Sequence, residues 1–502
     1  MRPALPLIPL IPGLCLVPMG LILFGDVHGG GLPLLCSFAA AALHPSLEPS
    51  VLVGVAMGIR ITLVVTLVSW GISSVLGCLL GVLGSKKIWR LWAGITWPAL
   101  MLRKGLAPLR AVHELIWGLL LLQILGLNGW VAVIAIVIPY TVLLARVIAD
   151  QIDCQEPPAL PALQSSGASA VSVLLTVVVP AVAHPVLDHI NHRLDCALRS
   201  SLILGVFGLG GLGTDLMLSL QSLRFQEVWT GLWLMAITMV LMDRVLRLFR
   251  HRWWMTPIPL VLALMTAGLG SSLTLELPWP NPQLWPFWNA QINGVQALAA
   301  VAEVNWPVVI ASTLSITLMA TCVSTALPPM LLLLWPSAWS LPLQSLIWGA
   351  LRLIPPPLSA LLLLVVAKPS LSLAALALGL HHGGVMGRVF IDDLQRERHH
   401  TTGMLKACGA SARMSWLYGP LAKVSRPYLA YATYRMDVIL RDTAVVGLVG
   451  GAGLGWQLLE ALSSFHWWLV LWLVGGSALL TLLGENLSER LQSCWNSRAM
   501  AL

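Results

Sequence analysis

Two short patterns of charged residues interrupt apolar sequence, and their spacing could do chemistry. Each has an arginine, an aspartate two residues later and another arginine four residues after that: Arg193, Asp195 and Arg199, then Arg435, Asp437 and Arg441. On a helix, an acid followed by a base at i,i+4 shares one face and forms an ion pair. The leading arginines lie off that face. We expect Arg193 and Arg435 to be cations beside a path for an anion; the alternative is that they reach the membrane interface and anchor the helix.

Both patterns belong to one internal repeat. Arg193 and Arg435 are 242 residues apart, the difference between their numbers, and their counterparts keep that offset. It also relates the glycines that follow, which are Gly208 and Gly211 in one half and Gly450 and Gly453 in the other. Apolar composition does not produce glycines, arginines and aspartates in fixed register. We infer one ancestral unit, doubled, with repeats at 1–250 and 251–502.

The composition is that of an all-α polytopic membrane protein. Of 502 residues, 57% are hydrophobic and 10% charged, whereas about 25% of a soluble domain is charged; mean hydropathy is +0.84. Apolar runs of about 20 residues can cross a membrane as helices. We place six per repeat, near 4–25, 51–83, 112–126, 130–149, 171–190 and 228–243, then near 255–275, 308–334, 346–367, 371–391, 414–434 and 466–483. The stretches 199–213 and 441–455 are expected to be re-entrant or half-length segments.

The basic residues predict the orientation of the chain. Its net charge of +8 comes from Lys and Arg that cluster after the second and sixth spans and around the loop after the fourth span of the second repeat. The positive-inside rule makes those loops cytoplasmic. The opposite loops, 26–50, 127–129 and 276–307, contain no Lys or Arg. We therefore expect both termini inside and both repeats in the same orientation, and the charge needs no nucleic-acid partner.

Other sequence signals are weak. Eight cysteines show no metal-ligand or disulfide spacing, and no phosphate-binding loop occurs, so we expect neither a metal nor a cofactor nor ATP hydrolysis in this chain. A cleaved signal peptide is the competing interpretation of the N-terminal apolar run. Since no small-residue cleavage site is clear, we favour an uncleaved first span.

A small-residue corner follows the fourth span of each repeat. It reads Gly167-Ala168-Ser169 before Pro180, and Gly409-Ala410-Ser411 before Pro420. This resembles the cytoplasmic coupling loop of ABC-importer permeases, which has Glu-Ala-Ala, three residues, a glycine and a distal proline. The opening glutamate is Pro161 in one copy and Gly403 in the other, and Pro420 arrives two residues early. Residues 151–166 are acidic and contain prolines, whereas residues 392–413 are basic, so the two loops are expected to dock unequally.

The segment from Tyr434 to Gly455 is similar to the signature of phosphonate-transport permeases, with Tyr-Arg, an acid, Arg and then a glycine-rich ending. The first repeat has the same pattern with His192 in place of the tyrosine, and the residues from Arg110 to Glu114 also resemble that family. The resemblance implies the type I fold of binding-protein-dependent ABC-importer permeases, with both halves of the translocation path in one chain. The paired glycines would lie with the arginines at the gate.

The resemblance also implies partners and a location. Two copies of an ABC ATPase, which would hold ATP and magnesium, would dock at 151–180 and 392–420. A periplasmic or extracellular solute-binding protein would deliver a phosphonate or related phosphorus oxyanion, and the chain would lie in the bacterial inner membrane. The alternatives are a fused permease for ferric iron or thiamine, and an ion-coupled secondary transporter with parallel repeats. The latter would need carboxylates at the membrane midplane, and these spans contain few.

Overall fold

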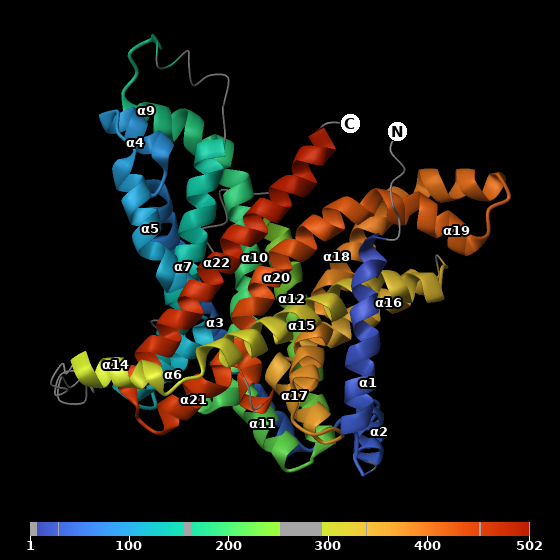
Figure 1. The fold of residues 1–502 in the computed structure, drawn as a ribbon. Coiled ribbons are helices and arrows are strands. Elements are labelled where there is room, and N and C mark those ends of the chain that lie inside the picture. Colours follow the sequence, from blue (N-terminus) through green and yellow to red (C-terminus); the bar gives the residue numbers. More distant parts are fainter. Residues whose placement is uncertain are drawn as a thin grey trace. The chain divides into compact units, whose positions relative to one another are not determined.

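The computed structural model describes residues 8–28, 30–154, 163, 165–250, 294–337, 339–450 and 453–500. Nearly all of them are helical (Figure 1). The chain divides into two compact units. We call His44–Gln291 the first unit, and Met1–Leu43 together with Ile292–Leu502 the second unit.

The first unit begins with a long apolar helix and ends with another. Its helices are α3 (Pro49–Leu83), α4 (Lys86–Ala93), α5 (Trp97–Ala111), α6 (Glu114–Leu125), α7 (Gly129–Cys154), α9 (Ala170–Val173), the π-helical η2 (Leu174–Val178), α10 (Val179–Leu204), the π-helical η3 (Gly205–Leu209), α11 (Leu212–Gln221) and α12 (Phe225–Arg250).

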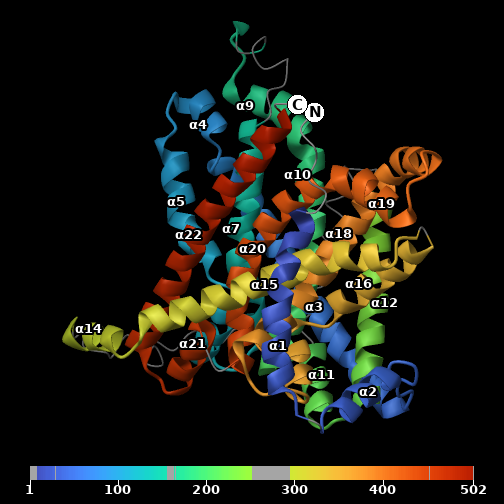
Figure 2. The same cartoon turned by 45° about the vertical axis from the view of Figure 1, so that its right-hand side comes forward.

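The second unit has the same order of main helices after its N-terminal segments (Figures 1 and 2). Its helices are the 3₁₀-helical η1 (Ile8–Cys15), α1 (Leu16–Asp26), α2 (Leu32–Ala41), α14 (Gly294–Ala302), α15 (Trp306–Leu334), α16 (Ser340–Leu353), α17 (Pro356–Leu364), α18 (Leu371–Ala407), α19 (Ala412–Trp416), the π-helical η7 (Leu417–Leu421), α20 (Ala422–Gly450), α21 (Leu454–Ser463) and α22 (Trp467–Met500).

The membrane-spanning helices agree largely with the sequence. Among the described residues, eight helices are long and apolar enough to cross a membrane, or up to ten if each bent pair is one span. Ten of the predicted runs coincide with these, so the chain is a multi-pass membrane protein. The predicted span at 414–434 falls on α19, η7 and α20, which do not qualify; α20 carries six charged side chains. The predicted span at 255–275 lies outside the described residues.

Two pairs of helices are sharply bent. Helices α5 and α6 meet at 82°, and α16 and α17 meet at 90°. In the second unit the bend lies at Ile354, whose backbone is extended because proline follows it. In the first unit His113 is extended and caps α6 by accepting a hydrogen bond from Leu115 N through Nδ1. The expectation of an unbroken helix over 346–367 was therefore wrong.

The N-terminal helices pack with the second unit, not with the repeat that follows them in sequence. Helices η1 and α1 lie against α15, and His28 N donates to Val366 O while Lys368 N donates to Asp26 O. The described residues before His44 therefore belong to the second unit and not to the first, although the predicted first repeat, 1–250, includes them. This backbone pairing and packing hold them there. The boundary at 250 itself borders residues that are not described, and the doubling stays a prediction.

Glycines let α7 approach α3 closely within the first unit. A Cβ at Gly77 would lie 2.6 Å from Leu144 Cβ, and a Cβ at Gly81 would lie 2.7 Å from Ile148 Cβ. Glycines four residues apart share one helix face, and such small residues at membrane helix interfaces permit tight packing. This contact matters to the functional site because it fixes α7.

We expect Gly81→Val to lower the thermal unfolding midpoint of the purified chain, since the overpacked Ile148 contact costs about 1–3 kcal/mol. The matched control is Gly54→Val on the same helix, where an added Cβ meets nothing within 4 Å. Tryptophan fluorescence during a thermal ramp in detergent measures both. Equal midpoints for the two variants would contradict the packing argument.

Candidate functional site

The two predicted ion pairs are present. Arg199 Nη2 contacts Asp195 Oδ2 on α10, and Arg441 Nη2 contacts Asp437 Oδ2 on α20. The first pair is the wetter one, because the Asp195 side chain is 29% exposed and that of Asp437 only 7%. The buried Nε of both arginines and Oδ1 of Asp437 have no hydrogen-bond partner among the described residues. Each pair therefore neutralises charge at a site with little other compensation.

Arg193 belongs to a cluster that the sequence did not reveal. Its guanidinium carbon lies 5.8 Å from the centre of the Tyr140 ring, a cation–π arrangement. The Tyr140 hydroxyl lies 2.8 Å from Ser200 Oγ, and Ser200 Oγ lies 2.5 Å from Glu114 Oε1 and donates to it. We call Glu114, Tyr140, Arg193 and Ser200 the first polar cluster. It joins α6, α7 and α10.

Arg435 has an equivalent environment in the second unit. Its Nη2 donates to Nδ1 of His382 on α18, and His382 Nε2 lies 3.1 Å from Asp442 Oδ2. If Nδ1 accepts from Arg435, the ring proton of neutral His382 is on Nε2. The Nε of Arg435 is buried without a hydrogen-bond partner among the described residues. We call His382, Arg435 and Asp442 the second polar cluster.

The clusters match at the repeat offset of 242. Tyr140 corresponds to His382, Arg193 to Arg435 and Ser200 to Asp442, whereas the counterpart of Glu114 is Pro356. Each cluster therefore holds an arginine, a ring and one carboxylate, but the carboxylate has moved from the start of α6 to α20. The sequence alone shows that these residues correspond. It does not show that they contact one another, because those contacts depend on helix packing.

Paired threonines fix the glycine turns. Gly211 and Gly453 have φ of +83° and +88° and directly precede α11 and α21. Leu212 N donates to Thr62 Oγ1 on α3 at 3.0 Å, and Leu454 N donates to Thr313 Oγ1 on α15 at the same distance. Because the threonines cap helices that start at a left-handed glycine, the same turn is held in both units.

The glycine-rich stretches are helix breaks rather than re-entrant segments. Gly208 has φ of +87° and forms a kink inside η3, and Gly450 is the last residue of α20. The half-length segments are the ten-residue helices α11 and α21 that follow. The expectation that 199–213 and 441–455 themselves form such segments was wrong, since α10 and α20 extend well into both stretches.

The predicted coupling corners have one local structure. Gly167 and Gly409 adopt φ of +76° and +83°, and the next amides, of Ala168 and Ala410, donate five residues back to Leu163 O and Leu405 O. This is the glycine-dependent closure of a helix end.

Serine then starts the next helix in both copies. Ser169 Oγ accepts from Ser172 N, and Ser411 Oγ accepts from Met414 N, as N-caps do. The distal prolines coincide with π-helical turns: Pro180 follows η2, and Pro420 lies in η7. Proline cannot donate a backbone hydrogen bond, which suits such a locally widened helix. The predicted inequality of the loops therefore does not arise from the corner itself.

We expect Arg441→Gln to reduce folded protein more than Arg199→Gln does. Leaving the buried Asp437 carboxylate unpaired costs about 3–5 kcal/mol, while the more exposed Asp195 can be hydrated. Monodisperse yield by size-exclusion chromatography measures this. Adding Asp437→Asn to Arg441→Gln should restore yield, because no charge is then stranded; equal losses without rescue would contradict the argument.

Curated relatives of the chain are transport-system permeases. The chain is 30% identical over 138 residues to the phosphite transport system permease protein PtxC of Stutzerimonas stutzeri. The aligned residues make up 28% of this chain and 50% of that protein. It is 25% identical over 433 residues to the phosphate-import permease protein PhnE of Mycolicibacterium smegmatis, covering 79% of this chain and 78% of that protein.

The chain spans about half the length of the phosphite relatives it matches, and no family model matches it. It is also 32% identical over 91 residues to the cryptic phosphonate transport system permease protein PhnE2 of Escherichia coli, covering 18% of this chain and 75% of that protein. The coupling corners and the arginine–glycine pattern, which carried the resemblance in the sequence, both form ordered structure in each unit. The chain therefore belongs to the phosphonate-transport family of ABC-transporter permeases.

Proposed function

We propose that this chain is the membrane permease of an ABC importer for phosphonate or a related phosphorus oxyanion, with one half of the translocation path in each unit. The observation that carries the proposal is the pair of equivalent arginine clusters around Arg193 and Arg435. The relatives are named for phosphite, phosphate and phosphonate, which share a tetrahedral anionic group. Family membership favours this substrate class over ferric iron or thiamine.

Arginine suits this task because its planar fork of N–H donors matches phosphate-type oxygens and its charge is permanent. Within the membrane an arginine needs support, which each cluster gives by one ring and one carboxylate. Glu114 contacts Ser200 in the first cluster, and Asp442 contacts His382 in the second. In this proposal Arg193 and Arg435 contact the oxyanion through charge-assisted hydrogen bonds.

Conversion of ATP energy into movement requires partners. We assign the exposed corners at Gly167–Ser169 and Gly409–Ser411 to two copies of a separate ATPase, which holds ATP and magnesium. A closed, serine-capped corner is a stiff element that transmits a push to α10 and α20, the helices that carry the arginines. An external solute-binding protein delivers the ligand, and the chain lies in the bacterial cytoplasmic membrane with both termini inside.

We expect the double variant Arg193→Gln/Arg435→Gln to raise the KM for uptake about tenfold or more per arginine, because charge-assisted hydrogen bonds contribute about 1.5–3 kcal/mol. Uptake of radiolabelled phosphite and methylphosphonate is measured in cells lacking other importers, at equal membrane abundance. Arg224→Gln is the control, since that side chain is 68% exposed at a turn. Normal KM values in the double variant would remove the clusters from the substrate path.

We expect the purified chain to retain two ATPase subunits from its own operon and to lose them when Gly167→Pro and Gly409→Pro are combined, because proline cannot adopt the left-handed corner. Native mass spectrometry reads the stoichiometry. Gly126→Pro is the matched control, with φ of +71° at the turn between α6 and α7. Retention of both subunits by the corner variant, or loss in the control alone, would contradict this docking site.

A further inference from the structure

Helix α4 is a basic, aromatic helix next to the end of a membrane span. Its sequence is Lys-Lys-Ile-Trp-Arg-Leu-Trp-Ala, with three cations, two tryptophans and no acid. It starts two residues after α3, a spanning helix of 35 residues. At 1.5 Å per residue α3 is about 52 Å long, so even at a 40° tilt it exceeds the roughly 30 Å hydrocarbon core. Helix α3 therefore extends beyond the core, and we place α4, which follows its end, at the level of the headgroups because of its cations and tryptophans.

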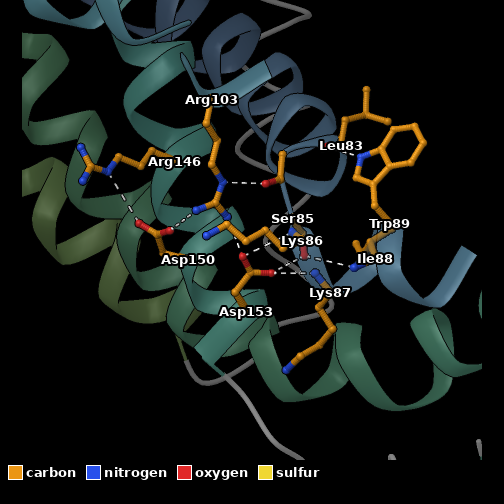
Figure 3. Close-up of polar contacts among 11 residues, drawn as sticks. Leu83, Ser85, Lys86, Lys87, Ile88, Trp89, Arg103, Arg146, Asp150 and Asp153 are labelled. Atoms are coloured by element: carbon orange, nitrogen blue, oxygen red, sulfur yellow. Dashed lines mark hydrogen bonds and ion pairs between the residues drawn. The ribbon is translucent and has the colours of Figure 1, made fainter. Parts of the chain in front are cut away.

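A carboxylate cluster fixes how α4 leaves α3 (Figure 3). Asp153, near the end of α7, accepts from Ser85 Oγ at 2.7 Å and from the backbone amides of Lys86 and Lys87 at 3.3 and 3.1 Å. Arg103 of α5 lies between two carboxylates, with Nη2 2.7 Å from Asp153 and Nη1 2.8 Å from Asp150. Its Nε donates to Gly84 O at 2.7 Å. Helix α4 is thus held at its N-terminus and cannot rotate freely.

The contacts of Asp153 and Arg103 described above determine which face of α4 is exposed. Ile88 is 2% exposed and packs into the core with Trp70 and Leu144. Trp92 is 48% exposed and stacks edge-on with Trp89, with ring centroids 6.3 Å apart. Arg90 is exposed, and Lys86 and Lys87 are half-buried. The accessible part of α4 therefore combines cations with indole rings, as interfacial membrane helices do.

The exposed face continues beyond α4. Gly94 ends the helix with φ of +67°, and Trp97 and Met101 on α5 are 59% and 67% exposed. The charge at this end is positive: the described residues 84–104 and 146–154 hold six Lys or Arg (Lys86, Lys87, Arg90, Arg103, Lys104 and Arg146) against Asp150 and Asp153, which leaves four net positive charges.

The second unit keeps the Arg146–Asp150 pair, as Arg388 and Asp392, but its described residues at the repeat offset lack the other features. At the offset of 242, Arg103 corresponds to Ser345 and Asp153 to Gln395, and the residues aligned with α4, 328–335, contain no Lys or Arg. A structural feature that both halves of the translocation path need would be present in both units. The α4 surface is therefore a property of the first unit alone, and it does not depend on the proposed substrate.

We propose that α4 and the adjoining Trp97 turn form a binding surface for anionic phospholipid headgroups of the cytoplasmic leaflet. The cations match the lipid phosphates, and the tryptophans suit the headgroup region. A lipid surface fits better than a protein partner because α4 lies at the headgroup level. Helix α4 also contacts α9, which directly follows the first coupling corner (Figures 1 and 2). Lipid bound at α4 would therefore restrict the movement of that corner.

The full chain is purified in detergent and given equimolar phosphatidylglycerol and phosphatidylcholine, and native mass spectrometry measures the ratio of retained lipids. We expect the wild type to prefer phosphatidylglycerol and the variant K86Q/K87Q/R90Q to lose that preference, by about fivefold per cation removed. The variant R396Q/K406Q/R413Q loses the same charge from exposed positions around the second corner and should keep the preference.

A charge-conserving variant, K86R/K87R/R90K, keeps the test decisive if the neutral variant folds poorly, because it should bind phosphatidylglycerol as the wild type does. Equal loss in the α4 and control variants would overturn the proposal, since net charge alone would then explain binding. Unchanged lipid preference together with loss of the ATPase from the α4 variant would overturn it too, and would assign this face to the ATPase.

Discussion

The structure depends on how arginines are balanced inside a membrane protein. A guanidinium taken out of water is costly unless a carboxylate lies within contact distance. Asp195 with Arg199 and Asp437 with Arg441 meet that requirement within a single helix turn. Because each pair is made on one helix, it forms regardless of how neighbouring helices pack. The neighbouring helices can therefore contact a second arginine, Arg193 or Arg435, that has another role.

That second arginine is balanced across helices, and the two units do this differently. The first unit takes its carboxylate from Glu114 and links it through Ser200 to the Tyr140 ring, whereas the second takes it from Asp442 and links it through His382. A carboxylate at either position gives the cluster the same charge. Such an exchange is expected if net charge, rather than one particular acid, is what the site requires.

The peripheral parts of the repeats diverge more. The coupling corners and the threonine-capped glycine turns are nearly identical in both units, because a left-handed glycine and one capping hydroxyl determine each. Among the described residues, a helix held as α4 is occurs in the first unit and not in the second, and helices η1 and α1 pack with the second unit. The two units thus agree in local structure at the corners and glycine turns, and they differ in helix α4 and in the N-terminal helices.

The sequence by itself determined the local features. Apolar runs located ten of the spans, i,i+4 spacing paired Asp195 with Arg199, and Gly-Ala-Ser placed the corners, because each depends only on neighbours along the chain. Tertiary structure decided what joins helices far apart in sequence: the Tyr140 and His382 contacts, the bend before Pro355, and the placement of α1. Helix packing brings such groups together, and the repeat offset alone could show that Tyr140 and His382 correspond but not that each touches an arginine.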